Sequence, residues 1–330
     1  MIEKSRARRE ARRRQLRRRR RLAGGLAGAV VIGAIVVVVS SPSGGPRSVG
    51  RSAPKVIHSL TVPRTVSPKR RHVGSHTAAS GTTKRLGRHG TEAAPVLMYH
   101  VIAAPPPGAR FPGLYVPAAE FAAQMAALAV AGFHAVTLDQ LEAPWQKDVP
   151  LPAGRPIVLT FDNGYRSQYT RALPILRRLH WRGDLNLQLS GLPPLQGGLS
   201  QTQVRRLVAA GWELDSQTFS HPDLTTLNPA QLHYQVAVAR TVIQRRYHVE
   251  AHWFCYPSGR YNATVEAAVK RAGYVGSTTT IPGWAHPNED PYRLERIRVL
   301  GGTSPQALLS LIAATRANGP PPLSYTGGSA

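Results

Sequence analysis

The chain is poor in cysteine and in acidic residues. Its 330 residues include one cysteine, Cys255, which excludes an intrachain disulfide and a zinc cluster built from several thiolates. No cysteine directly follows the apolar segment near the N-terminus, which excludes lipid attachment there. Hydrophobic residues make up 42% of the chain. That is enough for a sizeable core, so a folded domain without disulfides is expected.

The shortage of acidic residues is confined to two segments. Residues 1–21 hold twelve Lys and Arg and two acids, a net charge of +10, and residues 41–92 hold ten and one, a net charge of +9. Residues 93–330 hold twenty basic and fourteen acidic groups, a net charge of only +6. A nucleic-acid footprint would place the excess on the folded part. We therefore expect no nucleic-acid partner, and the basic flanks instead favour a membrane topology signal.

Residues 22–39, between the two basic segments, carry no charge. As a helix they would be about 27 Å long, which is just enough to cross a hydrocarbon core. Five arginines directly precede this run, and fewer basic residues follow it closely. The pattern predicts a transmembrane signal anchor over residues 22–40, with a cytoplasmic tail (1–21) and an extracytoplasmic C-terminal domain in a single-pass membrane protein. The alternative is a cleaved signal peptide and a secreted protein, but the apolar run is long and no Ala-x-Ala-like site follows it.

Beyond the anchor, composition divides the rest of the chain into three parts. Residues 41–92 are rich in Ser, Pro, Gly, Arg and His and are expected to form a disordered basic linker. Residues 93–316 are expected to form the folded domain, and residues 317–330 a disordered tail. In the folded part, patterns typical of strands (96–101, 157–161, 185–189, 212–215, 252–256 and 275–279) alternate with helical ones (117–131, 167–180, 201–210, 228–247 and 263–272). Repeated βα units predict a parallel sheet or barrel, with the site at the carboxyl ends of its strands.

Four of the predicted strand ends carry polar motifs. His100 ends PVLMYH, and Asp162 lies within PIVLTFDNGY. Gln217 and His221 lie within ELDSQTFSHPDL, and Cys255 lies within FCYPSGRYN. In this order and at these spacings the motifs resemble the polysaccharide deacetylase family, the NodB homology domain of carbohydrate esterase family four. The segments STTTIPG (277–283) and LERIRV (294–299) are also similar to the family, and the resemblance covers about two thirds of the chain.

The resemblance implies an α/β fold, a distorted (β/α) barrel of the NodB type, that acts on N-acetylated polysaccharide or peptidoglycan. Family members hold a divalent metal, often zinc, which polarises the N-acetyl carbonyl and activates a water molecule. A carboxylate takes the proton from that water. An Asp and two His bind the metal, and an Arg-x-Pro-x-Gly segment orients the carboxylate while its backbone donates to the developing oxyanion.

The metal-binding residues of the family are only partly present in this sequence. Asp162 falls on the general base and His221 on the second metal-binding His. Asn163 falls on the metal-binding Asp and Gln217 on the first metal-binding His. Amide oxygens donate weakly and carry no charge, and a zinc site needs at least three good ligands. The family's metal site is therefore expected to be degenerate or absent.

The residues that would hold the base and the substrate also depart from the family. Cys255 falls on the base-orienting arginine, and residues 294–299 contain no counterpart of the family's late histidine. His100 could replace that histidine as the acid, or pack beneath the loop 105–108. The expected substrate-binding residues are Tyr165, Cys255, Tyr256, Pro257, Ser258 and Gly259. Tyr165, Tyr256, Tyr261 and Trp284 are aromatic residues that suit sugar stacking, although each alone is as well explained by packing.

Two functions remain open at this point. The first is a membrane-anchored polysaccharide deacetylase that releases acetate from N-acetylated cell-envelope glycan. The second is a catalytically lapsed deacetylase fold that binds glycan or a wall-assembly partner.

Overall fold

The computed structural model of the chain describes residues 92–146, 149, 151, 154–192, 197–317 and 319–327. The predicted tail (1–21), the anchor (22–40) and all of the predicted linker except Glu92 lie outside these residues. None of the helices in the described part combines the length and the apolar composition needed to span a bilayer.

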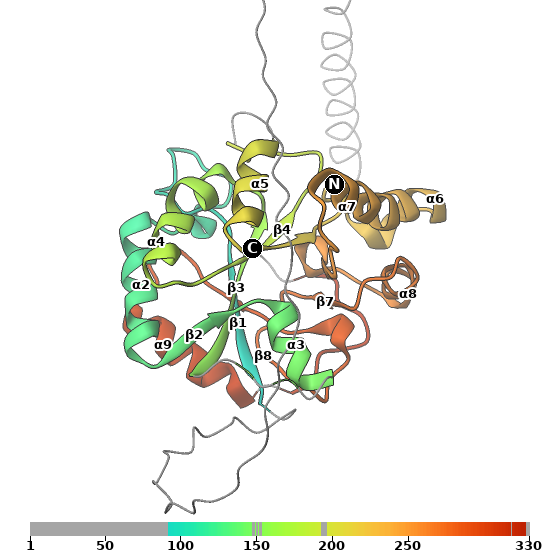
Figure 1. Cartoon of the computed structure of the whole chain (residues 1–330). Coiled ribbons are helices and arrows are strands. Elements are labelled where there is room, and N and C mark those ends of the chain that lie inside the picture. The colour runs from blue at the N-terminus through green and yellow to red at the C-terminus, as the bar shows by residue number, and fades with distance from the viewer. Residues whose placement is uncertain are drawn as a thin grey trace, which may run out of the picture. The chain divides into compact units, whose positions relative to one another are not determined.

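Within the described part, nine strands form one sheet (Figure 1). They are β1 (Ala94–Tyr99), β2 (Phe133–Val136), β3 (Arg155–Asn163), β4 (Asp184–Leu187), β5 (Glu213–Ser216), β6 (Trp253–Cys255), β7 (Gly276–Thr278), β8 (Trp284–Ala285) and β9 (Ile297–Arg298). The lateral order is β7-β6-β5-β4-β3-β1-β8, with β2 beside β3 and β9 beside β1. Apart from the antiparallel β1–β8 pair, these strands run parallel.

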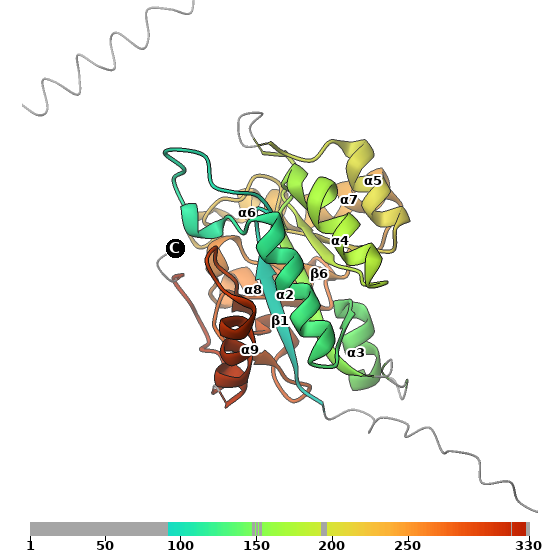
Figure 2. The same cartoon turned by 90° about the vertical axis from the view of Figure 1, so that its left-hand side faces the viewer.

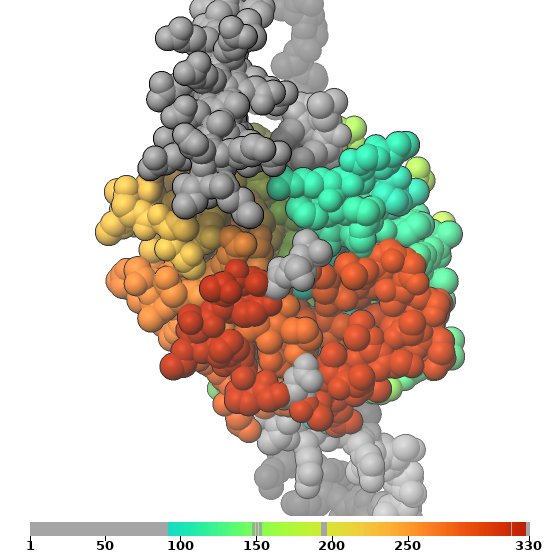
Figure 3. All heavy atoms as spheres, turned by 180° about the vertical axis from the view of Figure 1, so that it is seen from behind, coloured from blue at the N-terminus to red at the C-terminus, as the bar shows by residue number. Residues whose placement is uncertain are grey.

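Apart from α3, the helices lie around the outside of the strands (Figure 1). They are α2 (Ala118–Val130), α3 (Leu138–Gln146), α4 (Leu173–Arg178), α5 (Gln201–Ala209), α6 (Pro229–His233), α7 (Ala239–Tyr247), α8 (Ala263–Arg271) and α9 (Pro305–Ala314). Far apart in sequence, α2 and α9 pack against each other, and Figures 2 and 3 show them side by side. The predicted α/β fold of parallel strands is confirmed, and it takes the form of a half-barrel. Sequence patterns missed β2, α3, β8, β9 and α9.

The predicted helix over 228–247 illustrates how local sequence sets the elements. Asn228 Oδ1 accepts from the Gln231 N–H at 2.9 Å, and Gln231 Oε1 accepts from the Asn228 N–H at 3.1 Å. This reciprocal capping box, with Pro229 at the first helical position, fixes the start as predicted. The helix continues through a π-helical turn (Tyr234–Val238) into α7, and His248 ends it with a φ of 56°.

Alternating side chains along the strands divide the core into two layers. One face of the strands, including Leu97, Leu159 and Phe161, packs against the surrounding helices. The other face points into the barrel, where Val158 and Trp253 pack together with apolar residues of α3. Helix α3 therefore fills the barrel interior near the amino ends of the strands.

Residues 294–298, which we call the closing segment, bridge the two sides of the barrel at the carboxyl ends of its strands. On one side the Leu294 N–H donates to Ser277 O at 3.0 Å, and the Thr279 N–H donates to Leu294 O at 2.9 Å. On the other side Ile297 and Arg298, as β9, pair with β1. The side chain between these contacts, Arg296, is fully buried.

The barrel interior also holds an acid cluster at the amino ends of β4 and β5, which consists of Asp184, Glu213 and Asp215. The Leu138 N–H donates to Asp184 Oδ2 at 2.9 Å, and the Asp139 N–H donates to Glu213 Oε2 at 3.1 Å. These two carboxyl groups therefore cap the N-terminus of α3. One oxygen of each of the three acids is buried and accepts no hydrogen bond from the described residues.

The acids of the cluster resist ionisation. Burial is the main cause and the repulsion between neighbouring carboxylates adds to it, because no guanidinium or ammonium group of the described part forms an ion pair with them. The pKa of Asp184 and of Asp215 is raised well above the usual value, and the pKa of Glu213 is raised to about 7. The cluster therefore ionises at higher pH than ordinary carboxyl groups do.

Candidate active site

Asp162 lies at the carboxyl end of β3 and is only 1% exposed. Its Oδ1 accepts from Asn186 Nδ2 at 2.8 Å and from Arg296 Nη1 at 2.8 Å, and its Oδ2 accepts from Arg296 Nη2 at 2.9 Å. The Cys255 thiol lies 3.7 Å from Oδ2. Burial alone would raise the pKa of Asp162, but the guanidinium outweighs it and lowers the pKa to about 2. The carboxylate is ionised, and most of its acceptor positions are taken.

Arg296 is the residue that sequence reasoning missed. It comes from the closing segment and uses its remaining donors on Thr279 O at 2.7 Å and Thr160 Oγ1 at 2.9 Å. Burial opposes its charge, but Asp162 more than compensates and raises the pKa of the guanidinium. The segment 294–299 lacks the family's late histidine, but its Arg296 forms the bidentate pair that Cys255 cannot form.

Cys255 at the end of β6 is a partner of this pair and is fully buried. Its sulfur accepts from Arg296 Nη2 at 3.2 Å. Burial raises the pKa of the thiol to about 12, so the thiol stays neutral and is not an activated nucleophile. A guanidinium at position 255 would have to occupy the space that Arg296 fills from the other side.

The positions that bind metal in the family meet beside Asp162 at the carboxyl ends of the strands, which we call the mouth. The side chains at these positions are poor metal ligands. Gln217 Oε1 accepts from the backbone N–H of Asn163 at 2.7 Å, so the two replaced positions are hydrogen-bonded to each other. His221 lies nearby, and burial lowers its pKa, which leaves a neutral imidazole. Within the described residues no three His, Cys, Asp or Glu side chains are arranged to hold a metal ion. One imidazole, two amides and a carboxylate paired with Arg296 do not fit zinc.

His100 ends β1 and faces the base position. Its Nε2 lies 3.9 Å from Asp162 Oδ2, its side chain is 12% exposed, and its buried Nδ1 has no hydrogen-bond partner in the described part. Burial lowers the pKa of His100 to about 4 despite the attraction of Asp162. At neutral pH His100 is a neutral imidazole, so it cannot act as an imidazolium acid.

The turn after β6 is present, but the backbone N–H groups of Tyr256 and Gly259 are occupied. Gly259 has a φ of 71°, and a Cβ there would lie 2.1 Å from Thr280 Oγ1, so only glycine fits. The Gly259 N–H donates to Tyr256 O at 2.8 Å, and the Tyr256 N–H donates to Thr278 O at 3.2 Å. These two amides are therefore not free for an oxyanion, and Pro257 is buried while Ser258 is exposed.

The aromatic residues predicted to stack on sugars are dispersed. Tyr256 and Tyr261 are buried and stack on each other, with ring centroids 4.9 Å apart. Trp284 pairs with the first residues of β1, at the opposite end of the barrel. Only Tyr165, half-buried and bridged to Gly198, follows a strand end at the mouth and keeps some exposed surface. Burial, which sequence alone could not give, separates Tyr165 from the other three.

Comparison with known proteins agrees with this architecture. Residues 152–277 match the family model described as polysaccharide deacetylase. The Bacillus subtilis protein YxkH, whose name assigns it provisionally to the polysaccharide deacetylases, is 28% identical over 222 residues, 67% of this chain and 77% of its own. The poly-β-1,6-N-acetyl-D-glucosamine N-deacetylase of Escherichia coli is 41% identical over 58 residues, which cover 18% of this chain and 8% of that protein.

A solved structure gives the same result. The Streptococcus pyogenes deacetylase PplD in complex with acetate is 26% identical, with a TM-score of 0.62 over 67% of this chain and 99% of its own. The resemblance predicted from the strand-end motifs is thus confirmed by the match of residues 152–277 to the polysaccharide deacetylase family model. The family match ends before the closing segment, so Arg296 lies outside it.

Proposed function

We propose that the protein binds N-acetylated cell-envelope glycan at the carboxyl ends of its strands, and that metal-dependent deacetylation has lapsed there. The observation that carries the proposal is the 2.7 Å hydrogen bond from the Asn163 N–H to Gln217 Oε1. It joins the two positions at which the family places an anionic and an imidazole ligand. Neither side chain carries charge, so a divalent cation would have only His221 as a good ligand.

The state of Asp162 supports the same reading. A general base works best with a pKa near the working pH, whereas the pKa of Asp162 is about 2. Its lone pairs already accept three hydrogen bonds, from Asn186 and from both terminal nitrogens of Arg296. A water molecule to be activated has at most about one acceptor position left, on the Oδ2 atom that also faces the Cys255 thiol.

Glycan is the proposed ligand because of the family and the relatives. Two relatives are deacetylases by name, and one of them is named for an N-acetylglucosamine polymer. Tyr165 at the mouth keeps part of its surface exposed, and His100 provides a neutral imidazole, for hydroxyl and amide groups of a sugar. A lapsed site can keep these contacts while it loses the metal.

Retained deacetylase activity is the second candidate, and one observation favours it. Arg296 gives Asp162 the bidentate guanidinium contact that the family resemblance assigned to position 255. An arginine moved to a new position still orients the carboxylate. The two candidates differ in whether the protein binds metal and releases acetate.

The experiment uses the full chain, dialysed against zinc and against cobalt. Bound metal, acetate released from an N-acetylglucosamine oligomer, and binding of that oligomer are measured in parallel. We expect no stoichiometric metal, no acetate and saturable binding. Tight stoichiometric metal with acetate release would overturn the proposal in favour of the second candidate, and the lack of oligomer binding would overturn the glycan assignment.

A double variant tests whether the metal was lost by simple replacement. Asn163→Asp with Gln217→His returns the family's ligand types beside His221. We expect zinc affinity to rise by at least about 100-fold, since even indirect ligand changes cost 10–100-fold. Asn288→Asp with Gln201→His makes the same exchanges at exposed positions and should change nothing. Equal affinity of both variants would mean that the mouth has been rebuilt for another use.

We further infer that residues 22–40 anchor the protein in the cell membrane, with residues 1–21 cytoplasmic, 41–92 a linker and the domain outside. The uncharged run between two basic segments supports this layout. The full chain should remain in membranes after alkaline extraction and lose its domain to external protease. Recovery of a shortened chain in the medium would instead support a cleaved signal peptide.

A further inference from the structure

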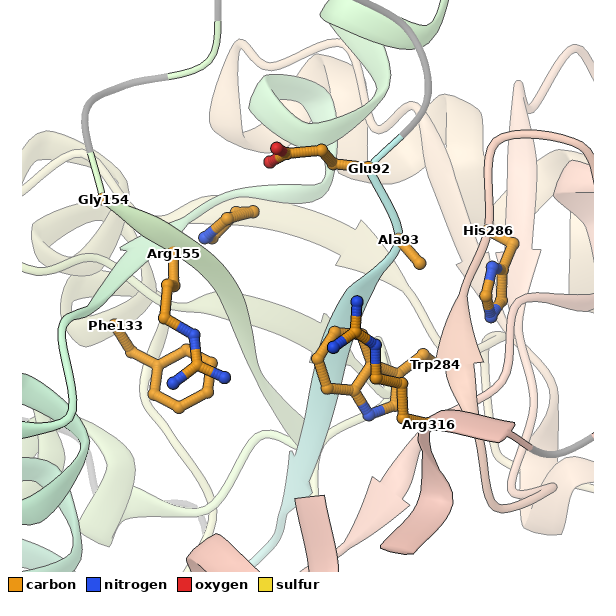
Figure 4. Close-up of a pocket in the computed structure, with 9 residues that line it drawn as sticks. Glu92, Ala93, Phe133, Gly154, Arg155, Trp284, His286 and Arg316 are labelled. Carbon is orange, nitrogen blue, oxygen red and sulfur yellow. The ribbon is translucent and has the colours of Figure 1, made fainter. Parts of the chain in front are cut away.

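A cavity of about 480 Å³ lies at the amino ends of β1 and β3, at the other end of the barrel from Asp162 (Figure 4). Its volume falls within the range of about 300–1,000 Å³ that is typical of small-molecule sites. The ionisable residues that line it come from four separate parts of the chain: Glu92, Arg155, His286 and Arg316. None of them belongs to the mouth described above.

Two guanidinium groups dominate the lining, and each lies over an aromatic ring. The Arg155 guanidinium carbon is 4.1 Å from the centroid of Phe133, and that of Arg316 is 5.2 Å from the centroid of Trp284. Figure 4 shows each guanidinium against its ring, with His286 on the far side of Trp284. A guanidinium whose flat face lies on an aromatic ring can still donate hydrogen bonds from the N–H groups around its edge.

Most of these N–H groups have no protein acceptor. Arg155 donates one hydrogen bond, from Nη1 to Ala131 O at 3.2 Å. Arg316 forms no hydrogen bond and no ion pair with the part of the chain that the structure describes. Since a guanidinium has five N–H donors, the two residues leave a marked surplus of donors at one cavity. Glu92 is the one carboxylate in the lining, so positive charge is in excess there.

We propose that this cavity binds a phosphate group carried on a sugar or polyol unit. A guanidinium matches the charge and the several acceptor oxygens of phosphate, to which it can offer two parallel N–H donors, and this cavity has two guanidiniums in its lining. His286 can add a further donor from the other side of Trp284. A neutral sugar fits less well, because the faces of Phe133 and Trp284 that could stack on it are buried under the guanidiniums. The site goes beyond the proposed function and does not depend on it.

The experiment titrates the full chain with glucose 6-phosphate by isothermal calorimetry, with glucose and inorganic phosphate in parallel. We expect saturable binding of the sugar phosphate, weaker binding of phosphate alone and none of glucose. Glycerophosphoglycerol, a phosphodiester, distinguishes a free monoester from a unit of a phosphate-linked polymer. Binding of either phosphate compound at this cavity supports the proposal, and the tighter one identifies the source.

Variants tie the binding to the cavity. Arg155→Gln and Arg316→Gln should each weaken binding by at least about tenfold, because each removes charge-assisted hydrogen bonds. The control Arg177→Gln with Arg178→Gln removes two exposed charges from α4 and should leave the affinity unchanged. If Arg155→Gln fails to fold, Arg316→Gln alone decides, since Arg316 has no hydrogen bond or ion pair to lose among the described residues. No saturable binding by the wild type, or equal loss in the control, would overturn the site.

Discussion

The barrel interior holds buried carboxyl groups in two places, and they behave in opposite ways. At the carboxyl ends of the strands Asp162 is ionised, with a pKa lowered to about 2. Within the same barrel, the acid cluster at the amino ends includes Glu213, whose pKa is raised to about 7. Burial opposes ionisation at both places, so depth in the protein does not explain the difference.

The guanidinium of Arg296 accounts for the difference between the two pKa values. Arg296 meets both oxygens of Asp162 within 2.9 Å, whereas the cluster receives uncharged donors such as the Leu138 N–H. Neutral donors satisfy hydrogen bonds but do not compensate the repulsion between neighbouring carboxylates. Of the buried acids in the barrel interior, Asp162 is therefore charged because the closing segment supplies a cation, whereas the acids of the cluster have none and their pKa values are raised.

Removing the guanidinium should make Asp162 resemble the acids of the cluster. We expect Arg296→Met to lower the free energy of unfolding by about 3–5 kcal/mol, because it leaves Asp162 buried without a counter-ion. The pKa of Asp162 should rise at the same time. Urea unfolding at neutral pH measures the first effect, and its pH dependence measures the second.

Two comparisons make that result specific. Arg296→Met combined with Asp162→Asn should recover most of the lost free energy. Arg260→Met breaks the pair with Asp223, in which the arginine is 44% exposed, and should cost less than about 1 kcal/mol. A loss at Arg296 no larger than the loss at Arg260 would contradict the role given to the buried pair.

The acid cluster should make stability fall as pH rises. The pKa of Glu213 is higher in the folded than in the unfolded protein, so its contribution is fully present below about pH 4.5 and lost as pH rises through about 7. The difference in free energy of unfolding between wild type and Glu213→Gln should therefore shift by about 2–3 kcal/mol in favour of the variant between pH 5 and pH 8. A pH-independent difference would mean that Glu213 ionises normally.

His100 should show the opposite sign. Its pKa is about 4 in the folded protein, so the unfolded chain binds the proton more tightly and stability is lost as pH falls below about 6.5. Relative to His100→Gln, the wild type should lose about 2 kcal/mol between pH 7 and pH 5. Nuclear magnetic resonance titration of the imidazole gives an independent check, and a pKa near 6.5 would refute the prediction.

Cys255 should have the smallest effect of the groups around Asp162. Its thiol is neutral and lies 3.7 Å from the carboxylate, a weak contact beside the bidentate pair. We expect Cys255→Ala to cost about 1 kcal/mol, mostly through lost packing. A cost as large as that of Arg296→Met would mean that the thiol, and not the guanidinium, sets the charge state of Asp162.

The α/β fold was predictable because its signals are local. The motif around Asp162 follows a run of apolar residues, and Asn228 with Gln231 forms a capping box that can be read directly from the sequence. The family resemblance then placed Asn163, Gln217 and His221 at one mouth, and the hydrogen bond between Asn163 and Gln217 agrees with that placement.

The rest required contacts between distant residues. Arg296 and Asp162 are 134 residues apart, and no periodic pattern links them. Tyr256 is aromatic and follows a strand end, as Tyr165 does, yet it is fully buried. Spacing predicts which end of the barrel a residue reaches, whereas the packing of other elements decides whether it is accessible.

The position of the closing segment near the end of the chain has a consequence for folding during synthesis. A ribosome that has released β3 to β7 has produced Asp162 but not yet its counter-ion. Until residues 294–298 emerge, Asp162 must stay hydrated or protonated, and the strands around it cannot close over a charge. Water can therefore be excluded from around Asp162 only after β9, the last strand, has been made. A chain truncated after residue 277 would contain the whole family match but would lack Arg296, the group that lets Asp162 be buried.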